Sequence, residues 1–333
     1  MRSLVKFGLF FTLFIGVLYA HPIGVKTDML GREFEDKSYE RLLFIGSGSL
    51  RIAMYLDLEN RVVGIEIREK NTPNNVPYSE KVKALNLQNT LPIIGEGGPG
   101  KLPNFEAVIK CNPDLIIASR LDLSQVELLE SKVGVPVFVI SYDKEYDGRE
   151  DKLRSVKEAI EKVADIAEVK DRGDELLTFM ASQEEKLSTL KLDDKKVYIG
   201  GLNFKGSRGL VSTEAYFPPL LMLGLENAIT SKDGLNQIFA SEESILRANP
   251  DVIFIDESNR EKVDSEIASK NELFSYVNAV KNSEIWTTSI YNFYSTNVEN
   301  LYIIAYEIAY ALGQDIDLDS KRVQIKRAFL GEF

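Results

Sequence analysis

The chain has one cysteine, Cys111, and one histidine, His21, among its 333 residues. A single cysteine cannot form a disulfide within the chain. Zinc sites and bis-histidine haem sites need several thiolate or imidazole ligands, so the sequence excludes them. It also excludes Cys–His nucleophilic catalysis and a Ser–His–Asp triad in the body of the chain. We therefore expect neither a catalytic site nor a metal site that depends on clustered histidine or cysteine side chains.

Basic residues are fewer than acidic residues. There are 40 Lys and Arg against 51 Asp and Glu, which gives a net charge of −11. Binding to nucleic acid through bulk positive charge is therefore not expected. Glycine and proline number 22 and 11, and 44% of the residues are hydrophobic, which argues against a disordered or collagen-like chain. At about 150 residues per domain, the length suits two domains.

The first twenty residues have the pattern of a secretory signal peptide. A short basic start with Arg2 and Lys6 leads into an apolar run over residues 7–20. The run is shorter than the roughly 20 apolar residues that span a membrane. We expect cleavage after Ala20, and no cysteine follows the run to carry a lipid. The mature chain is then expected to be soluble in the periplasm, with a net charge of −13 and His21 at its mobile N-terminus.

An internal repeat divides the chain. Residues 106–117 and 243–254 share an acid, an apolar pair, a base, a small residue, then Asn-Pro-Asp and an apolar run. Proline disfavours helix in the residue before it, so each copy predicts a helix that stops at Asn112 or Asn249. A buried parallel strand follows each helix. Two copies 137 residues apart predict two related α/β lobes rather than a solenoid.

Further strands are expected where apolar runs lie between helical patterns, at residues 42–45, 62–65, 135–141, 197–199 and 284–287. Residues 150–190 hold no proline and one glycine, and their apolar periodicity predicts amphipathic helix, broken or kinked once near residues 171–173. The expected domains are therefore an N-terminal lobe (21–149), a helical connector (150–190) and a C-terminal lobe (191–333). The predicted fold class is α/β, with two Rossmann-like lobes joined by a long rigid helix and a ligand cleft between them.

Loops at the carboxyl ends of parallel strands are where open α/β sheets bind ligands. In this chain those loops hold Ser47, Arg51 and Arg120 in the first lobe, and residues 203–209 and 289–296 in the second. They concentrate basic and aromatic residues in a protein that is strongly acidic. This contrast favours an anionic or aromatic ligand held between the lobes.

One glycine-rich segment has a nucleotide-binding pattern that fails in detail. Residues 95–101 satisfy G-x-x-x-x-G-K. Leu102 stands where a serine or threonine would bind magnesium, and Pro99 removes one of the amides that would hold phosphate. We therefore expect a tight glycine loop at the rim of the first lobe.

The last long helix carries two patterns. Thr296 and Glu299 have the spacing of a capping box at its start. Tyr302, Tyr306 and Tyr310 follow as a stripe with helical spacing, which favours packing against a neighbouring element over ligand contact.

These motifs resemble a known family, the substrate-binding proteins of ABC importers for iron chelates, haem and cobalamin. The resemblance covers nearly all of the mature chain. It is strongest from residues 102–106 into 112–117, and in the second copy at 243–254, while residues 198–209 and 291–294 resemble a subgroup. It implies two Rossmann-like lobes joined by one long helix, a ligand in the cleft and little movement on binding.

The resemblance also implies a partner, a membrane permease with two subunits. Arginines of the permease pair with one acid on each lobe, and by motif position these acids are Glu106 and Glu243. An acid in the first turn of a helix also favours the helix dipole, and the two roles are compatible. The protein is expected to be a monomer.

The expected ligand is a chelated metal, because family members for bare zinc or manganese use clustered histidines, which this chain lacks. A ferric siderophore is the first expectation, haem and a corrinoid are the alternatives, and no cofactor is expected. Tyr291 and Tyr294 are the candidates to donate a phenolate to iron. With Ser47 from the first loop, the side chains of the type that holds such ligands are Arg51, Arg120, Lys205, Arg208, Tyr216, Tyr291 and Tyr294.

Two other classes of function stay open from the sequence. One is a sensor that binds the same ligand but docks on a receptor other than a permease. The other is a secreted α/β enzyme whose acid–base groups are carboxylates such as Glu96, Glu214 or Asp256. No spacing in the sequence selects a pair of them.

Overall fold

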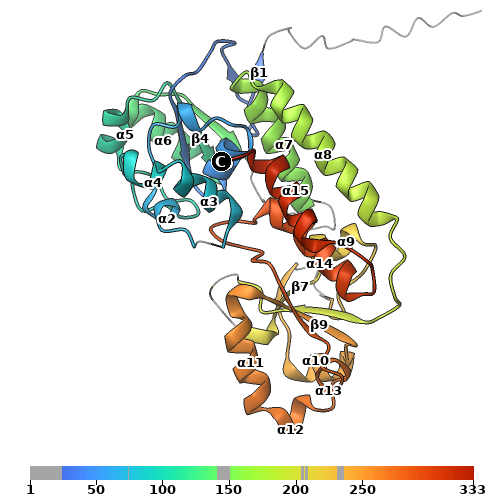
Figure 1. Ribbon diagram of the computed structural model, residues 1–333. Coiled ribbons are helices and arrows are strands. Elements are labelled where there is room, and N and C mark those ends of the chain that lie inside the picture. The colour runs from blue at the N-terminus through green and yellow to red at the C-terminus, as the bar shows by residue number, and fades with distance from the viewer. Residues whose placement is uncertain (1–24, 74, 141–150, 204–205, 207–208, 231–235) are drawn as a thin grey trace, which may run out of the picture.

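The computed structural model describes residues 25–73, 75–140, 151–203, 206, 209–230 and 236–333. The expected signal peptide, His21, Lys205 and Arg208 lie outside these residues. Among the helices of the described residues, none is long and apolar enough to cross a membrane. The fold is α/β, with parallel sheets in two lobes, as the sequence predicted (Figure 1).

The first lobe is built on three parallel strands in the order β3-β4-β5: β3 (Leu42–Ile45), β4 (Leu115–Ser119) and β5 (Val137–Ile140). Every residue in them is buried, which accounts for their almost continuous apolar sequence. Helices and an antiparallel pair of short strands complete this part of the chain. They are β1 (Lys26–Thr27), β2 (Glu33–Phe34), α1 (Ser49–Tyr55), α2 (Ile67–Lys70), α3 (Pro77–Ala84), α4 (Leu87–Thr90), α5 (Phe105–Cys111) and α6 (Leu123–Val133).

The strand expected at residues 62–65 is not a regular strand, so that prediction was wrong. Val62 bridges Leu42 of β3, whereas Ile65 bridges Ile93 on the other side. Because the segment changes its pairing partner halfway, neither ladder is long enough to count as a strand. It still extends the edge of the sheet, and its carboxyl end leads directly into α2.

The second lobe repeats this plan with strands in the order β10-β9-β6: β6 (Val197–Gly200), β9 (Val252–Asp256) and β10 (Ile285–Thr288). A short antiparallel pair lies beside them, β7 (Ser212–Glu214) with β8 (Gln237–Phe239). The helices of this lobe are α9 (Pro218–Met222), α10 (Glu242–Ala248), α11 (Arg260–Ser269), α12 (Asn271–Phe274) and α13 (Asn278–Lys281).

The internal repeat appears as two equivalent units, α5 with β4 and α10 with β9. Each helix begins at a capping side chain, Asn104 accepting from the N–H of Ala107 in α5, and Ser241 accepting from that of Ser244 in α10. Each helix ends at an asparagine in the left-handed conformation, Asn112 or Asn249. Each strand then occupies the centre of its sheet, which confirms the helix, stop and strand predicted from the repeat.

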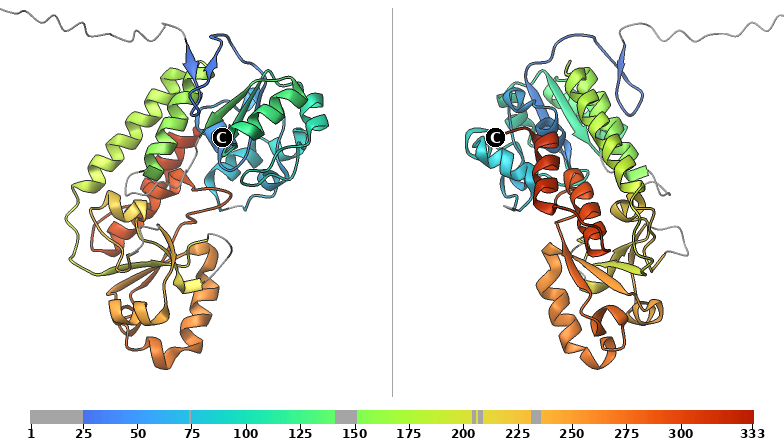
Figure 2. Two further views of the ribbon diagram at one scale, coloured as in Figure 1. Left: turned by 180° about the vertical axis from the view of Figure 1, so that it is seen from behind. Right: turned by 45° about the vertical axis from the view of Figure 1, so that its right-hand side comes forward.

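The connector consists of two helices rather than one kinked helix. α7 (Asp151–Ile166) and α8 (Lys170–Ser188) pack side by side, as both views of Figure 2 show. The turn between them contains Glu168 with φ 57°, so the break predicted near residues 171–173 was misplaced. Gly173 lies inside α8, where its lack of a side chain lets the two helices approach. A Cβ atom at Gly173 would stand 2.5 Å from the Cβ of Ala164 in α7.

A second connection joins the lobes after β10. The chain passes through α14 (Val298–Ala311) to α15 (Leu318–Leu330), and α15 packs against α1 and α3 of the first lobe. In Figure 1 these red helices lie between the two lobes, beside α7 and α8. The domain boundaries drawn from the sequence at residues 149/150 and 190/191 remain predictions, and α15 completes the cover of the first lobe.

Two of the three tyrosines in the stripe of α14 pack against a neighbouring helix as predicted, whereas Tyr310 is 44% exposed beside Trp286. Tyr302 donates to Glu184 and Tyr306 to Gln183, both on α8, at 2.7 and 2.9 Å. The predicted capping box at the start of α14 was wrong. Asn297 is the N-cap residue, and Glu299 instead accepts hydrogen bonds from Tyr55 and from the N–H of Tyr78 in the first lobe.

We expect Gly173→Ala to destabilise the protein, although alanine favours helix over glycine by about 1 kcal/mol. The added methyl group would collide with Ala164, and such overpacking costs about 1–3 kcal/mol. Urea denaturation measures the change. Thr178→Ala, at an exposed position of the same helix, is the matched control and should leave stability within about 0.5 kcal/mol. A Gly173→Ala protein as stable as the wild type would contradict the close crossing of α7 and α8.

Candidate functional site

The candidate site lies where the carboxyl ends of the strands in the first lobe meet the segment between β10 and α14. In Figure 1 this orange segment runs from the second lobe to the lower edge of the first. Three contacts hold it there, from Tyr294, from the backbone of Phe293 and from Asn297. The geometry agrees with the rule that α/β sheets bind ligands at their carboxyl edge.

Tyr294 forms the central contact between the lobes at this site. Its hydroxyl donates to Glu66 Oε2 at 2.7 Å and accepts from the N–H of Gly98, also at 2.7 Å. Burial raises its pKa, and the carboxylate of Glu66 raises it further. Gly97 leaves room for this arrangement, since a Cβ atom there would stand 2.8 Å from the Tyr294 hydroxyl. The glycine loop at residues 95–101 therefore serves to admit a side chain from the other lobe.

A hollow of about 280 Å³ opens beside this contact. Most of the residues that line this hollow belong to the first lobe, and Phe293 lines it from the segment before α14. Arg68 and Lys101 are exposed in it, and neither forms an ion pair with a residue that the structure describes. The guanidinium of Arg68 stands 5.3 Å from the ring centre of Tyr294, a cation–π contact. The full lining is Ile67, Arg68, Asn71, Glu96, Gly97, Lys101 and Phe293.

Two carboxylates lie behind the hollow, and each is 3% exposed: Glu66 and Glu69. Burial raises the pKa of Glu66, although hydrogen bonds from Tyr294 and from the N–H of Gly46 partly offset this. Burial also raises the pKa of Glu69 to about 7, with the charge of Arg51 and a hydrogen bond from Tyr78 acting against it. The hollow therefore presents two exposed cations that form no ion pair with a described residue. The two carboxylates buried beneath it have raised pKa values.

Arg51 is 0% exposed and joins the lobes inside the protein. Its Nη2 donates to the carbonyl of Phe293 at 2.8 Å and to Asn297 Oδ1 at 2.9 Å. Its guanidinium also lies 4.1 Å from the ring centre of Tyr78. Its role as a ligand contact stays a prediction; the contacts described here are those of a link between the lobes.

The other predicted residues of the first lobe lie close to this edge. Ser47 is buried, and its hydroxyl has no hydrogen-bond partner among the described residues, while its carbonyl accepts from Ser119 Oγ at 2.6 Å. Arg120 is exposed directly after β4, with φ 61°, and its N–H donates to the carbonyl of Ile140.

In the second lobe, Tyr291 is fully buried rather than exposed on a loop. Its hydroxyl donates to Glu214 Oε2 and its N–H to Asp256 Oδ2, each at 2.7 Å. Its ring packs edge-on against that of Phe217, with the ring centres 4.8 Å apart. Tyr216, the residue before Phe217, is half-buried. The described part of the chain therefore brings Tyr294 to the hollow and keeps Tyr291 in the interior.

The three carboxylates considered for acid–base chemistry do not form a cluster. Glu96 is exposed at the hollow in the first lobe, whereas Glu214 and Asp256 are buried in the second. Both buried groups accept hydrogen bonds from Tyr291, which fits a structural role. Among the described residues there is no group of three or more His, Cys, Asp or Glu side chains able to hold a metal ion.

Glu106 and Glu243 occupy equivalent positions, in the first turns of α5 and α10. Both are exposed, and neither forms an ion pair with a described residue. The neighbouring Glu242 differs, because it pairs with Lys270. Two free carboxylates at matching places on the two lobes are compatible with a docking role, which stays a prediction.

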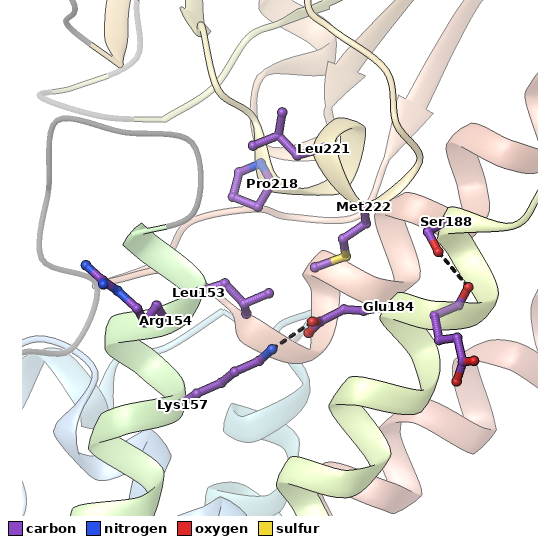
Figure 3. A pocket seen from close by; sticks show the side chains of 9 residues that line it. Leu153, Arg154, Lys157, Glu184, Ser188, Pro218, Leu221 and Met222 are labelled. Atoms are coloured by element: carbon purple, nitrogen blue, oxygen red, sulfur yellow. Dashed lines mark hydrogen bonds and ion pairs between the residues drawn. The ribbon is translucent and has the colours of Figure 1, made fainter.

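A larger hollow of about 700 Å³ lies between α7, α8 and α9, on the helical side of the molecule (Figure 3). Its apolar wall includes Leu153, Leu221 and Met222. Lys157 and Glu184 face each other across it in an ion pair of 2.7 Å, and Glu184 also accepts from Tyr302. We favour the smaller hollow, because it lies at the carboxyl ends of the strands and presents cations that lack an ion-pair partner among the described residues.

Sequence reasoning missed Arg68 and Glu66 as site residues. Glu66 directly follows the apolar run at residues 62–65, and Arg68 comes two residues later. The rule on carboxyl ends of strands applies to that run as well. Lys101 was weighed only as part of a nucleotide-binding pattern, and Phe293 only as one residue of a loop. Their meeting depends on the contact of Tyr294 with the glycine loop, which has no local signal in the sequence.

Comparisons with known proteins place this geometry in a family. Residues 47–290 match the family described as periplasmic binding protein. The Fe(3+)-citrate-binding protein YfmC of Bacillus subtilis is 25% identical over 189 residues, which are 55% of this chain and 56% of that protein. The chain thus aligns with little more than half the length of this relative.

Solved structures share the fold across most of the chain. The molybdate periplasmic binding protein MolA of Haemophilus influenzae has a TM-score of 0.69 at 21% identity, covering 92% of this chain and 98% of that one. The petrobactin-binding protein YclQ of Bacillus subtilis has a TM-score of 0.61 at 20% identity, covering 87% and 99%. The periplasmic haem-binding protein HutB of Vibrio cholerae has a TM-score of 0.60 at 18% identity, covering 82% and 99%.

These similarities confirm the fold and the expectation of a binding protein rather than an enzyme. The family match covers more than half of the chain, and it includes the repeat, the connector and the strands of both parallel sheets except β3. The chain therefore belongs to the periplasmic binding protein family.

Proposed function

We propose that this chain is the substrate-binding component of an ABC importer and that it captures an anionic iron chelate. The observation that carries the proposal is the family match over residues 47–290. Fe(3+)-citrate, petrobactin and haem, which the names of similar proteins give as their ligands, support a chelated iron. The ligand's negative charge is supported by the exposed cations Arg68 and Lys101.

The proposal includes a ligand position at the lower edge of the first lobe. Arg68 and Lys101 would accept the carboxylates or other anionic oxygens of the chelate, and Phe293 would cover its apolar part. The hollow of about 280 Å³ is smaller than the usual 300–1,000 Å³ of ligand pockets. It would thus hold one end of a chelate. Residues 204–205 and 207–208, which include Lys205 and Arg208, would contribute from the second lobe.

The remaining parts of the proposal concern place and partner. The first 20 residues would act as a signal peptide, and the mature protein would work in the periplasm as a monomer. It would deliver its ligand to a membrane permease, with Glu106 and Glu243 each pairing with an arginine of one permease subunit. Their exposure and their lack of ion pairs among the described residues support this pairing.

The first test is calorimetric titration of the mature protein with ferric citrate, a ferric siderophore, haem, cobalamin and molybdate. We expect ferric citrate or the siderophore to bind. Arg68→Gln with Lys101→Gln should raise the Kd by about tenfold or more, because a charge-assisted hydrogen bond contributes about 1.5–3 kcal/mol. Lys110→Gln with Lys132→Gln removes the same charge elsewhere on the first lobe and should leave the Kd unchanged. Failure of all five compounds to bind would refute the proposed function.

The second test concerns docking. Charge reversal by Glu106→Lys with Glu243→Lys should reduce iron uptake by host cells about tenfold or more, because like charges would then face each other. Ligand affinity should stay unchanged, since both residues lie outside the hollow. The matched control is Glu127→Lys with Glu272→Lys, again one exposed acid on each lobe. Undiminished uptake in the Glu106/Glu243 variant would show that the docking assignment is wrong.

A further inference from the structure

The hollow at the lower edge of the first lobe has two charged layers. Arg68 and Lys101 form the exposed layer, and Glu66 and Glu69 form a buried layer behind it. Tyr294 lies between the layers, with its ring beside the Arg68 guanidinium and its hydroxyl on Glu66. An anion placed in the hollow therefore changes the electrostatic surroundings of both carboxylates.

The groups that face the buried pair come from every element packed against it. Arg51 approaches from α1, and Tyr78 from α3 donates to Glu69 Oε2 at 2.7 Å. Arg68 acts from α2 itself, and Tyr294 donates from the segment after β10. The N–H of Gly46 donates to Glu66 Oε1 at 3.1 Å. Glu96 and Lys101 stand at the outer side of the hollow.

These surroundings do not stabilise two full negative charges. Both carboxylates are removed from water, which favours their neutral forms, and the charge of each raises the cost of ionising the other. Among the described residues no cation reaches either carboxylate within ion-pair distance. Arg51 is directed to Phe293 and Asn297, and Arg68 to the ring of Tyr294. Burial accordingly raises the pKa of both acids, that of Glu69 to about 7.

We propose that binding of an anion to Arg68 and Lys101 is coupled to uptake of a proton by the pair Glu66 and Glu69. This inference rests on the proposed function, because it concerns the same hollow. The anion brings further negative charge close to the pair and engages Arg68, whose charge otherwise favours the ionised carboxylates. Both effects favour protonation, and the proton comes from solvent. No other bond is made or broken.

Coupling of this kind sets the direction of the pH dependence. Because the bound state holds more protons than the free state, affinity falls as the pH rises through the range where the free pair loses its proton. If one proton is taken up for each anion bound, the Kd rises by at most about tenfold per pH unit. An anion would thus be bound more tightly at pH 6 than at pH 8.

The experiment is calorimetric titration at pH 7 in two buffers, PIPES and Tris, whose ionisation enthalpies differ strongly. The difference in observed heat measures the protons taken up per molecule bound. Ferric citrate is the first probe and molybdate the second, since molybdate itself carries no proton at this pH. For the wild type we expect uptake of a fraction of one proton per molecule bound. We also expect a Kd that rises severalfold between pH 6 and pH 8.

Glu69→Gln is the decisive variant, because the amide keeps an acceptor for Tyr78 but cannot ionise. It should remove most of the proton uptake and flatten the pH dependence, whereas Glu127→Gln, an exposed acid on α6, should change neither. Tyr78→Phe gives an independent readout. Losing the hydrogen bond to Glu69 further disfavours its ionised form, so the pH dependence should move to higher pH.

The outcomes separate this inference from the proposed function. If neither probe binds to the wild type, this inference fails, whereas the proposed function fails only if a ferric siderophore, haem and cobalamin do not bind either. If a probe binds with equal heat in both buffers, or if Glu69→Gln takes up as many protons as the wild type, only the coupling is overturned. Should Glu69→Gln fail to fold, Tyr78→Phe provides the test. A pH dependence of Kd that moves to higher pH supports the coupling, and one that does not move overturns it.

Discussion

The buried guanidinium of Arg51 holds the two lobes in their relative position. A buried charge of this kind is costly unless it is hydrogen-bonded, and the two acceptors described for its Nη2 come from the other lobe. The carbonyl of Phe293 and the side chain of Asn297 supply them. Two residues further on, Glu299 accepts from Tyr55 and from the backbone of Tyr78. The end of the segment before α14 and the first turn of α14 are therefore fixed to the first lobe.

This attachment determines what the site can be. With α7 and α8 on one side and the segment before α14 on the other, two separate parts of the chain hold the lobes together. A wide hinge opening would break the contacts of Arg51, Tyr294 and Glu299 at once. Under the proposed function, the site would therefore be largely formed before a ligand arrives, because Phe293, Arg68 and Lys101 already line one hollow. Preformed sites of this kind lose little conformational freedom on binding.

The architecture was largely readable from the sequence, because it depends on local patterns. The repeated Asn-Pro-Asp motif predicted two equivalent helix–strand units, and the apolar runs after it predicted the central strands. The connector was predicted as helix, but not its turn, because the signal at Gly173 marks a close helix crossing rather than a break. The segment at residues 62–65 has strand composition, yet it divides its pairing between two neighbours.

The site was predicted less well, because it depends on which side chains meet across the lobes. Tyr294 lies beside the hollow, against Arg68 and Glu66, and its predicted contact with a ligand stays a prediction. Arg51 and Tyr291 were named for their type and position in loops, but their side chains face the interior. Glu66 and Arg68 were missed because nothing local in the sequence marks a buried acid beside an exposed base. Their roles follow only from a contact between residues more than 220 positions apart.

The packing of α15 has a consequence for how the protein forms during synthesis. The apolar face that α1 and α3 present is covered by residues near 318–330, which leave the ribosome long after the first sheet is made. Until then the first lobe has its strands but exposes part of its core, a condition in which chains tend to associate. Secretion in an unfolded state would postpone folding until both halves of this contact are present. Covering of this face of the first lobe thus requires translation through α15.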